Sequence, residues 1–390
     1  MRNVAFHNLG CKVNSYEMDG IQQDFQKAGY NIVDFAQKSD IYIINTCSVT
    51  NIADRKSRQM IHRAKKQNPN AIVVALGCFV QENPEKAALD EAVDIVIGNN
   101  LKSQTFSIVE NYLNKAGEES VYVEDLTKNP QYEDICIEKS AEHTRAFIKI
   151  QDGCNQFCSY CIIPYVRGRI RSREKESILN EITIMANAGY KEIVITGIHL
   201  SSYGLDGVSY NEVAKDGYTN KELLDVIDEV SLIEGVERIR LGSLEPRLIT
   251  DEFLRRLSAN KKVCPHFHLS LQSGCDSVLK RMNRHYTTQE YAKRVALIRQ
   301  YYSHPAVTTD VIVGFPQETE EEFEVTRQYL NEIDFYEVHV FKYSRRAGTV
   351  ADKMTGQLTD SEKSKRSDIL LGDDAKRRKK FMEFYVGEDV

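Results

Sequence analysis

Short hydrophobic runs alternate with helical patterns over the first hundred positions of the chain. Four runs rich in β-branched residues predict strands at 4–9, 41–46, 71–76 and 94–98. Three segments with helical spacing lie between them, at about 15–28, 52–67 and 84–90. Runs that are apolar on both faces are typical of buried parallel strands. The alternation of strand and helix therefore predicts a parallel α/β domain, to which we assign residues 1–138.

A second alternating pattern begins near residue 145. Six runs predict strands at 146–150, 192–196, 237–241, 266–271, 307–313 and 335–341. Five helical patterns follow them, near 176–188, 221–230, 251–257, 288–301 and 319–333. Thr319 and Glu322 have the spacing of a capping box at the start of the last helix. We therefore expect an open (β/α)6 partial barrel over residues 139–370, with its chemistry at the carboxyl ends of the strands.

Length and composition fit an ordinary water-soluble protein. The chain has 390 residues, of which 42% are hydrophobic and 28% charged, enough for two domains. Neither a run of membrane-spanning length nor a secretory signal is present in the sequence, so we expect a cytoplasmic protein with no membrane partner. The formal net charge of −6 gives no argument for nucleic acid. No phosphate-binding G-x4-G-K-[ST] loop occurs, so we expect no nucleotide hydrolysis.

Three cysteines of the first domain each follow a predicted strand: Cys11, Cys47 and Cys78. Because parallel strands share one carboxyl edge, these thiols are expected to converge there. Three thiolates at one edge suit an iron–sulfur cluster. The alternative is three small core residues, because free cysteine is often buried.

The loop after the first barrel strand carries Cys154, Cys158 and Cys161 in a C-x3-C-x2-C spacing. A four-iron cluster normally takes four thiolates, so three leave one iron open to a chelating molecule such as S-adenosylmethionine. Tyr160 would then pack on its adenine. Two alternatives remain open: a zinc site with His143 as fourth ligand, and a redox pair formed by Cys158 and Cys161. The other cysteines, Cys136, Cys264 and Cys275, are expected to be structural.

Polar or small residues follow the ends of the later barrel strands. Each reads by itself as a turn residue, but together they predict a binding surface at one mouth: Gly197, His199, Ser243, Glu245 and Gln272. An acid-free stretch from 162 to 173 follows the second cysteine trio and holds four arginines: Arg167, Arg169, Arg171 and Arg173. We expect them to bind phosphates. The basic run 376–380 is equally compatible with a nucleic-acid contact and with an ordinary solvated face.

Several motifs together identify a family. The cysteine spacing resembles that of the radical S-adenosylmethionine superfamily. Within that superfamily the chain looks like the methylthiotransferases, through the motifs Asn8-Leu9-Gly10-Cys11-Lys12-Val13-Asn14, Asn45-Thr46-Cys47, Gly77-Cys78, Gln151-Asp152-Gly153-Cys154, Cys161-Ile162-Ile163-Pro164-Tyr165-Val166-Arg167-Gly168, His268-Leu269-Ser270-Leu271-Gln272-Ser273-Gly274, Asp310-Val311-Ile312-Val313-Gly314-Phe315-Pro316 and Gly348-Thr349-Val350-Ala351.

This resemblance implies two 4Fe–4S clusters, one on each cysteine trio, and replacement of a C–H bond by C–S–CH3. One S-adenosylmethionine would methylate sulfur at the first trio, and a second would supply the hydrogen-abstracting radical at the other. The family's branches modify threonylcarbamoyladenosine in tRNA, isopentenyladenosine in tRNA, or an aspartate of a ribosomal protein. The sequences around Lys12, Cys47 and Pro164 look most like the first branch, which implies the tRNA anticodon stem-loop and an electron donor protein as partners.

The resemblance also assigns roles to the surrounding residues. Those at the barrel mouth would bind S-adenosylmethionine: Tyr160, Gly197, Ser243, Glu245 and Gln272. The RNA would be held by Arg167, Arg169, Arg171 and His199. Family members carry a small C-terminal β-barrel, the TRAM domain, and the expectation for 371–390 is a linker and the stub of a truncated TRAM domain.

Overall fold

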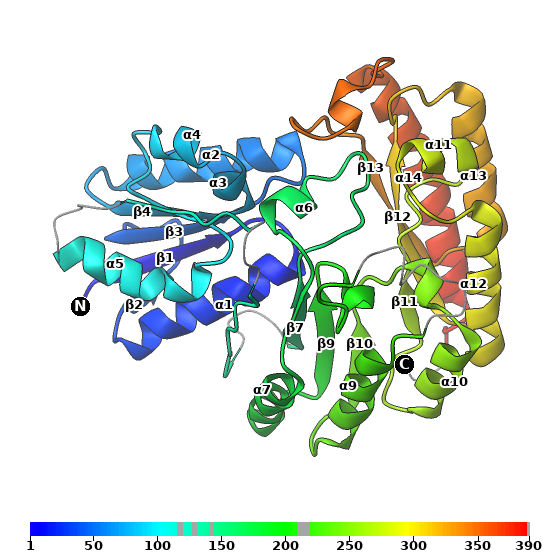
Figure 1. Ribbon diagram of the computed structural model, residues 1–390, viewed down its shortest axis with the longest axis horizontal. Helices are drawn as coiled ribbons and strands as arrows, with labels where there is room; N and C mark the ends of the chain where they lie inside the picture. Colours follow the sequence, from blue (N-terminus) through cyan, green and yellow to red (C-terminus); the bar gives the residue numbers. More distant parts are fainter. Residues whose placement is uncertain (115–119, 127–130, 140–143, 209–218, 388–390) are drawn as a thin grey trace.

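The first domain is a twisted parallel sheet with helices on both faces (Figure 1). The computed structural model describes residues 1–114, 120–126, 131–139, 144–208 and 219–387. The sheet has the order β2-β1-β3-β4-β5-β6. Its strands are β1 (Asn3–Asn8), β2 (Asn31–Val33), β3 (Ile41–Thr46), β4 (Ile72–Gly77), β5 (Ile95–Ile97) and β6 (Val121–Tyr122). All registers are parallel, so the carboxyl ends share one edge as predicted.

Alternating strand residues divide this domain into two cores. On one face Tyr42 and Ile44 of β3 pack against α2 (Asn51–Gln67), α3 (Cys78–Glu82) and α4 (Pro84–Ala88). On the other face Ile41 and Ile43 pack against α1 (Lys12–Lys27) and α5 (Thr105–Asn114). Both faces of the strands are therefore buried, which explains their uninterrupted hydrophobic runs. The short strands β2 and β6 and the helix α5 have no counterpart among the predicted elements.

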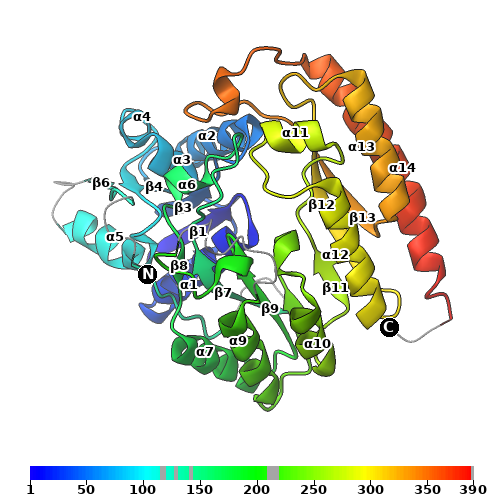
Figure 2. The same ribbon diagram turned by 45° about the vertical axis from the view of Figure 1, so that its right-hand side comes forward.

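The second domain is the predicted open barrel (Figure 2). Its strands are β7 (Ala146–Asp152), β9 (Glu192–Gly197), β10 (Arg238–Leu241), β11 (His266–His268), β12 (Ala306–Val313) and β13 (Glu337–Lys342). Two parallel groups, β10-β9-β7 and β11-β12-β13, are connected by the isolated bridges Ile239↔Val263 and Leu244↔Leu269. A two-residue strand, β8 (Arg171–Ser172), pairs antiparallel with the end of β7.

Helices cover the outer face of the barrel strands and leave the inner face turned toward the first domain (Figures 1 and 2). They are α7 (Lys175–Asn187), α9 (Lys221–Leu232), α10 (Asp251–Ala259), α12 (Thr288–Tyr301) and α13 (Glu320–Ile333). Thr319 and Glu322 form the predicted capping box at the start of α13. We call the space along the inner face the barrel lumen.

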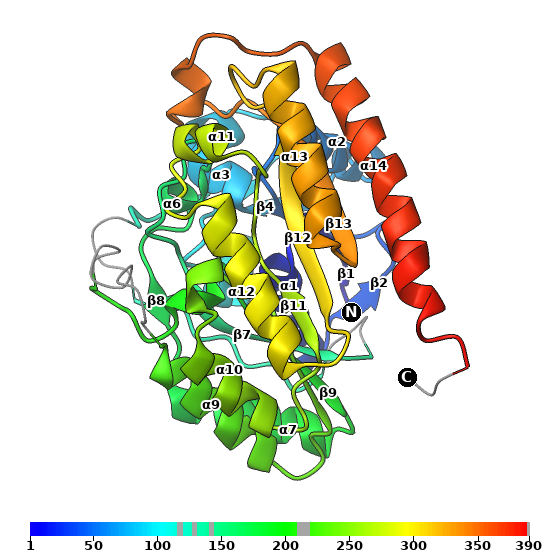
Figure 3. The ribbon, with the colours of Figure 1, turned by 90° about the vertical axis from the view of Figure 1, so that its right-hand side faces the viewer.

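A long final helix, α14 (Asp360–Glu383), runs beside α13 and packs against β13 (Figure 3). The expected boundary at residue 370 therefore falls inside this helix. Leu370, Asp374 and Arg377 are buried in it, and Asp374 accepts a hydrogen bond from the backbone of Val338 in β13. The helix was missed because charged residues occupy most of its positions, including buried ones. Among the described residues, no helix is long and apolar enough to cross a membrane.

Candidate active site

The first cysteine trio lies at the carboxyl edge of the first sheet. Cys11 follows β1 and occupies the N-cap position of α1, Cys47 follows β3, and Cys78 follows β4. Gly10 has a φ of +111°, and a Cβ there would lie 3.1 Å from the Cys47 Sγ. Burial raises the pKa of the Cys47 thiol to about 12, with further raising contributions from Cys78 and Cys11, so the three thiols are close neighbours. The predicted convergence is present.

Asn14 ties the loops of this trio together. Its side-chain amide donates to the carbonyl oxygens of Leu9, at 2.7 Å, and Thr46, at 3.2 Å. The Asn45 amide donates in turn to the Asn14 carbonyl, at 3.0 Å. The loops that carry Cys11 and Cys47 are thus fixed to the first turn of α1.

The second trio occupies the loop between β7 and the short helix α6 (Ile163–Val166). Gly153, at its start, has a φ of +73°, and a Cβ there would lie 1.8 Å from the Arg169 carbonyl, so glycine is required. Cys154 and Cys158 are buried and Cys161 is partly exposed. Burial, followed by the nearby Cys158 thiol, raises the pKa of the Cys154 thiol to about 12 and raises that of Cys161 as well.

A side chain that sequence reasoning missed, Arg284, lies beside the second trio. Its Nη1 donates to the Cys158 Sγ at 3.3 Å, and its guanidinium lies over the Tyr286 ring at 4.9 Å. Arg284 also contributes to lowering the pKa of His199 and opposes the upward shift of Glu245. It follows the short helix α11 (Asp276–Arg281), and no spacing relative to a cysteine marks it in the sequence.

A cavity of about 200 Å³ connects the loops of the two trios. The second trio contributes Tyr160 and Cys161, the Cys47 loop contributes Val49 and Thr50, and the barrel contributes Gln272, Asp310, Ile312 and Phe341, among others. Cys78 itself packs against Ile162 and Val166, which follow Cys161. The cavity therefore lies between the segment that follows Cys47 and the loop of the second trio, with Cys161 in its lining.

Two of the five predicted S-adenosylmethionine contacts line this cavity. Tyr160 and Gln272 line the cavity, and Gln272 has a φ of +71°, an uncommon conformation for a side chain of its size. Glu245 is buried, and burial raises the pKa of its carboxyl. Gly197 lies against Gln151, and Ser243 is exposed. His199 is held by hydrogen bonds to Gln151 and Ser202, and burial lowers its pKa to about 4.

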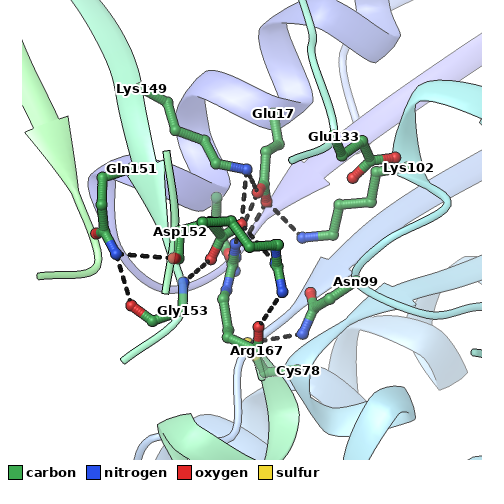
Figure 4. Close-up of polar contacts among 12 residues, drawn as sticks. Glu17, Cys78, Asn99, Lys102, Glu133, Lys149, Gln151, Asp152, Gly153 and Arg167 are labelled. Carbon is green, nitrogen blue, oxygen red and sulfur yellow. Dashed lines mark hydrogen bonds and ion pairs between the residues drawn. The ribbon is translucent and has the colours of Figure 1, made fainter. Parts of the chain in front are cut away.

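Six charged side chains form a buried ion network between the domains (Figure 4). They are Glu17, Lys102, Lys149, Asp152, Arg167 and Arg171, which we call the Glu17 network. The Glu17 carboxylate accepts from Lys102 at 2.5 Å, from Lys149 at 2.8 Å and from Arg167 at 2.7 Å. These cations hold the pKa of Glu17 well below its usual range despite its burial.

This network corrects the expectation for the arginine stretch. Arg167 and Arg171 are 0% and 1% exposed and pair with carboxylates of the protein, so they do not reach a bound phosphate. Arg173 is buried as well, against Glu181. Only Arg169 is exposed, with its guanidinium over the Phe157 ring at 4.5 Å. Local sequence gives no sign of this burial because Glu17 comes from the other domain.

Arg167 also links the two cysteine trios. It follows Cys161 in the chain, its Nη2 donates to Asn14 Oδ1 at 2.5 Å, and its charge partly opposes the rise that burial causes in the pKa of Cys47. The Asn99 amide donates to both the Val166 carbonyl, at 2.6 Å, and the Cys78 Sγ, at 3.5 Å. Buried positive charge and donors directed at sulfur offset part of the effect of burial on these thiols, and the thiolate is the form that binds iron.

Spacing separates the cysteine trios from a single-ion site. A single metal ion needs at least three His, Cys, Asp or Glu side chains whose ligand atoms lie close together. Among the described residues, His268, Asp310 and His339 form such a group, with ligand atoms within 4.8 Å of one another. Neither cysteine trio is that compact, which does not fit one zinc ion shared by three thiolates, whereas a four-iron cluster holds its thiolates further apart. His143, the fourth ligand of the zinc alternative, lies outside the described residues. The residues present therefore fit two clusters.

The group of His268, Asp310 and His339 lies in the barrel lumen. His268 shares hydrogen bonds with Thr308 at 2.9 Å and with Asp310 at 3.2 Å, and its ring stacks on His339 at 5.7 Å between centroids. Lys12 is a charged neighbour of Asp310. An adjacent ammonium disfavours a divalent cation, so we treat these side chains as a hydrogen-bonded wall.

Two family models match this chain. The Radical SAM superfamily matches residues 148–330, which include the second trio and most of the barrel. The family described as uncharacterized protein family UPF0004 matches residues 3–98, which include the first trio.

Curated relatives match nearly the whole chain. It is 42% identical over 388 residues to the threonylcarbamoyladenosine tRNA methylthiotransferase MtaB of Bacillus subtilis (strain 168), covering 100% of this chain and 84% of that protein. It is 34% identical over 371 residues to the tRNA-2-methylthio-N(6)-dimethylallyladenosine synthase of Thermodesulfovibrio yellowstonii, covering 94% of this chain and 81% of that protein.

A solved structure shares the fold. The radical S-adenosylmethionine methyltransferase TsrM from Kitasatospora setae superposes with a TM-score of 0.64 at 15% identity, covering 90% of this chain and 77% of that one. The predicted order of an N-terminal parallel α/β domain followed by a radical S-adenosylmethionine barrel is thus confirmed.

Proposed function

Since the chain belongs to the radical S-adenosylmethionine methylthiotransferase family, we propose that it methylthiolates carbon 2 of N6-threonylcarbamoyladenosine next to the tRNA anticodon. The observation that carries this proposal is the cavity lined by Cys161 of the second trio and by Val49 and Thr50, which follow Cys47 of the first. Addition of a methylthio group needs a hydrogen removed and a sulfur delivered at one carbon. A cavity that the loops of both trios line is suited to that requirement.

The superfamily uses a 4Fe–4S cluster and S-adenosylmethionine, and we assign that cluster to Cys154, Cys158 and Cys161. We assign a second 4Fe–4S cluster to Cys11, Cys47 and Cys78. When bound, these groups and two molecules of S-adenosylmethionine supply the methyl group, the sulfur and the hydrogen-abstracting radical. Because reductive cleavage consumes an electron, a separate electron donor protein completes the system.

The residues around the second trio position S-adenosylmethionine. Tyr160 and Gln272 present their side chains to the cavity, and Gly197, Ser243 and Glu245 follow the ends of the adjacent strands β9 and β10. Arg284 adds a cation between Cys158 and Glu245, suited to a carboxylate of the ligand.

The RNA enters as an unstacked nucleotide. Carbon 2 of a stacked adenine is out of reach of a cavity this small, so the base must leave its stack. Sequence-specific RNA recognition commonly uses such unpaired loop nucleotides. Arg169, exposed next to the cluster loop, is placed to neutralise a phosphate of the anticodon loop. His199 remains a proposal for stacking on the base.

Identity favours the threonylcarbamoyl substrate over the isopentenyl one. The relative named for threonylcarbamoyladenosine is 42% identical and the relative named for dimethylallyladenosine is 34% identical. The Lys12-Val13-Asn14 motif after Cys11 gives the same indication, and Asn14 is built into the first trio.

Reconstitution followed by a substrate comparison tests the proposal. Protein loaded anaerobically with iron and sulfide should hold about eight irons per chain, four for each cluster. With a strong reductant it should release 5′-deoxyadenosine and add a methylthio group, detected by mass spectrometry, to a threonylcarbamoyladenosine stem-loop. Product on an isopentenyladenosine stem-loop or a ribosomal protein instead would overturn the substrate assignment. About four irons would overturn the second cluster.

A further inference from the structure

The wall of the barrel lumen below the cavity is polar and positively charged. Asp310, Ile312 and Phe341 line the cavity, so alternate residues of β12 and β13 face the lumen. The pairings Asp310↔His339, His268↔Thr308 and His266↔Ala306 place the histidines on the same face. Further along the barrel, Arg240 of β10 and Phe147 of β7 both pair with Val194 of β9. The two residues therefore lie at the same level across these three strands. A row of polar and basic side chains therefore extends along the sheet from the residues that line the cavity.

Lys12 of the first domain projects into the same region. Its charged neighbours are Arg145 and Arg240, which are cationic, and Asp310. Its ammonium lies 6.0 Å from the Phe147 ring centroid, and the Arg145 guanidinium lies over the same ring at 5.8 Å. Lysine from the loop of the first trio and arginine from the barrel thus meet across the domain boundary.

Two of these groups have no hydrogen-bond or ion-pair partner in the part of the chain that the structure describes. Among the residues that the structure describes, the Lys12 ammonium has no carboxylate within 4.0 Å, although Glu192 pairs with Arg238, Arg240 and Arg145. The ring nitrogen Nδ1 of His266 is buried and has no hydrogen-bond partner either. Arg240, Lys12 and His268 are charged neighbours of His266. An unpaired ammonium beside two arginines and an unpartnered imidazole is a site for an anion.

We propose that Lys12, Arg240 and His266 bind the carboxylate of the threonylcarbamoyl group and so select this nucleoside over an uncharged one. The inference rests on the proposed function, whose substrate carries a carboxylate on the N6 substituent, whereas a prenyl substituent carries none. Carbon 2 and N6 lie on the same edge of adenine. A base with carbon 2 between the trios therefore directs its N6 substituent into the adjoining lumen.

The remaining groups of the wall suit the rest of the substituent. The threonylcarbamoyl group also has a hydroxyl and N–H donors. The Asp310 carboxylate, 28% exposed in its side chain, and His339 offer acceptors one step closer to the cavity. Cations at the far end and acceptors nearer the base match the order of the carboxylate and the N–H donors along the substituent.

A cycle of protein and substrate changes tests the inference. The substrates are an anticodon stem-loop with threonylcarbamoyladenosine and the same stem-loop with the carboxylate as its methyl ester. The variants are Lys12→Gln, Lys12→Arg and Arg240→Gln, with Lys27→Gln as the matched control, because Lys27 lies at the other end of α1 and is exposed. Iron content and 5′-deoxyadenosine release without RNA check that each variant is loaded and folded.

For the acid substrate, Lys12→Gln and Arg240→Gln should each lower kcat/KM by about 10- to 100-fold, the range for a hydrogen bond to a charged group. For the ester both variants should equal the wild type, and Lys12→Arg should restore most of the loss on the acid. Equal losses on acid and ester would overturn the carboxylate site while leaving the proposed function intact. A wild-type enzyme that modifies neither substrate would overturn the proposed function and this site with it.

Discussion

The two cysteine trios are assembled in different ways. Cys154, Cys158 and Cys161 share one loop, so their spacing along the chain already carries the information. Cys11, Cys47 and Cys78 belong to three loops, and only the parallel order β1-β3-β4 brings them together. The first site therefore exists only when a whole sheet has formed, whereas the second needs one loop and the groups that pack on it.

Removal of one ligand from each trio gives the largest expected difference between them. Cys158→Ala should abolish 5′-deoxyadenosine release. Cys47→Ala should keep that release but yield no methylthiolated product, because its trio is assigned to sulfur. Each variant should lose about four of about eight irons. Chromatography of deoxyadenosine, mass spectrometry of the RNA and iron analysis provide the measurements.

Cys136→Ala is the matched control for this pair, since Cys136 is exposed and belongs to neither trio. It should behave as the wild type. Full product formation by Cys47→Ala would remove the distinction between the trios, and with it the two-cluster assignment.

Loss of the Glu17 charge should affect the connection between the trios. Glu17→Gln leaves Lys102, Lys149 and Arg167 buried without their shared carboxylate, and breaking such a pair typically costs about 3–5 kcal/mol of unfolding free energy. Urea denaturation measures it. Glu138→Gln, at an exposed pair with Lys27, should cost less than about 1 kcal/mol. Similar losses in both variants would contradict the buried network.

The pH dependence of stability follows from the same carboxylates. Neighbouring cations lower the pKa values of Glu17 and Asp152. A lowered pKa means that the stabilisation is fully present above the ordinary carboxyl value, near about 4. It is lost as pH falls through the lowered values. Urea midpoints measured below about pH 4 should therefore drop more steeply for the wild type than for Glu17→Gln.

The donors directed at sulfur should distinguish the trios more finely. Arg284 gives a charged donor to Cys158, and Asn99 gives a neutral one to Cys78. Charge-assisted hydrogen bonds are roughly twice as strong as neutral ones. We expect Arg284→Met to slow 5′-deoxyadenosine release about 10-fold or more, and to make the second cluster harder to reduce in a redox titration. Asn99→Leu should leave 5′-deoxyadenosine release unchanged and lower the amount of methylthiolated RNA a few-fold. Slower 5′-deoxyadenosine release in both variants would contradict separate roles for Arg284 and Asn99.

The smallest expected effect concerns the surface beside the second trio. Arg169→Ala should reduce the slope of log K against log salt for stem-loop binding by about 0.7–0.9, the contribution of one phosphate contact. Its stability should not change, since Arg169 is exposed. Fluorescence anisotropy over a salt series measures the slope. An unchanged slope would mean that Arg169 contacts no phosphate and is an ordinary solvent-exposed residue.

Sequence patterns predicted the longer strands and most of the helices because these depend on short-range periodicity. The strand starting at 41 and the loop from 154 to 161 are clear in the sequence, and β3 and the second trio follow them closely. The patterns failed where a polar residue is buried by a partner from elsewhere. Glu17 lies on a helix that reads as half exposed, and Arg167 lies in a stretch that reads as basic surface, yet both are inaccessible.

Arg284 shows the same limit from the side of function. It follows Met282 and Asn283 without any spacing that relates it to Cys158, and only the fold brings it within 3.3 Å of that sulfur. The sequence can nominate ligands that share a motif, but it does not reveal the group that adjusts them from another loop.

The Glu17 network also has an evolutionary meaning. Its members are divided between the domains, with Glu17 and Lys102 in one and Lys149, Asp152 and Arg167 in the other. A recombination event that exchanged one domain between relatives would have to bring a matching set of charges or leave several of them stranded in the interior. The two halves are therefore expected to be inherited together, and a chimaera between branches should fold only if this set is transplanted as a unit.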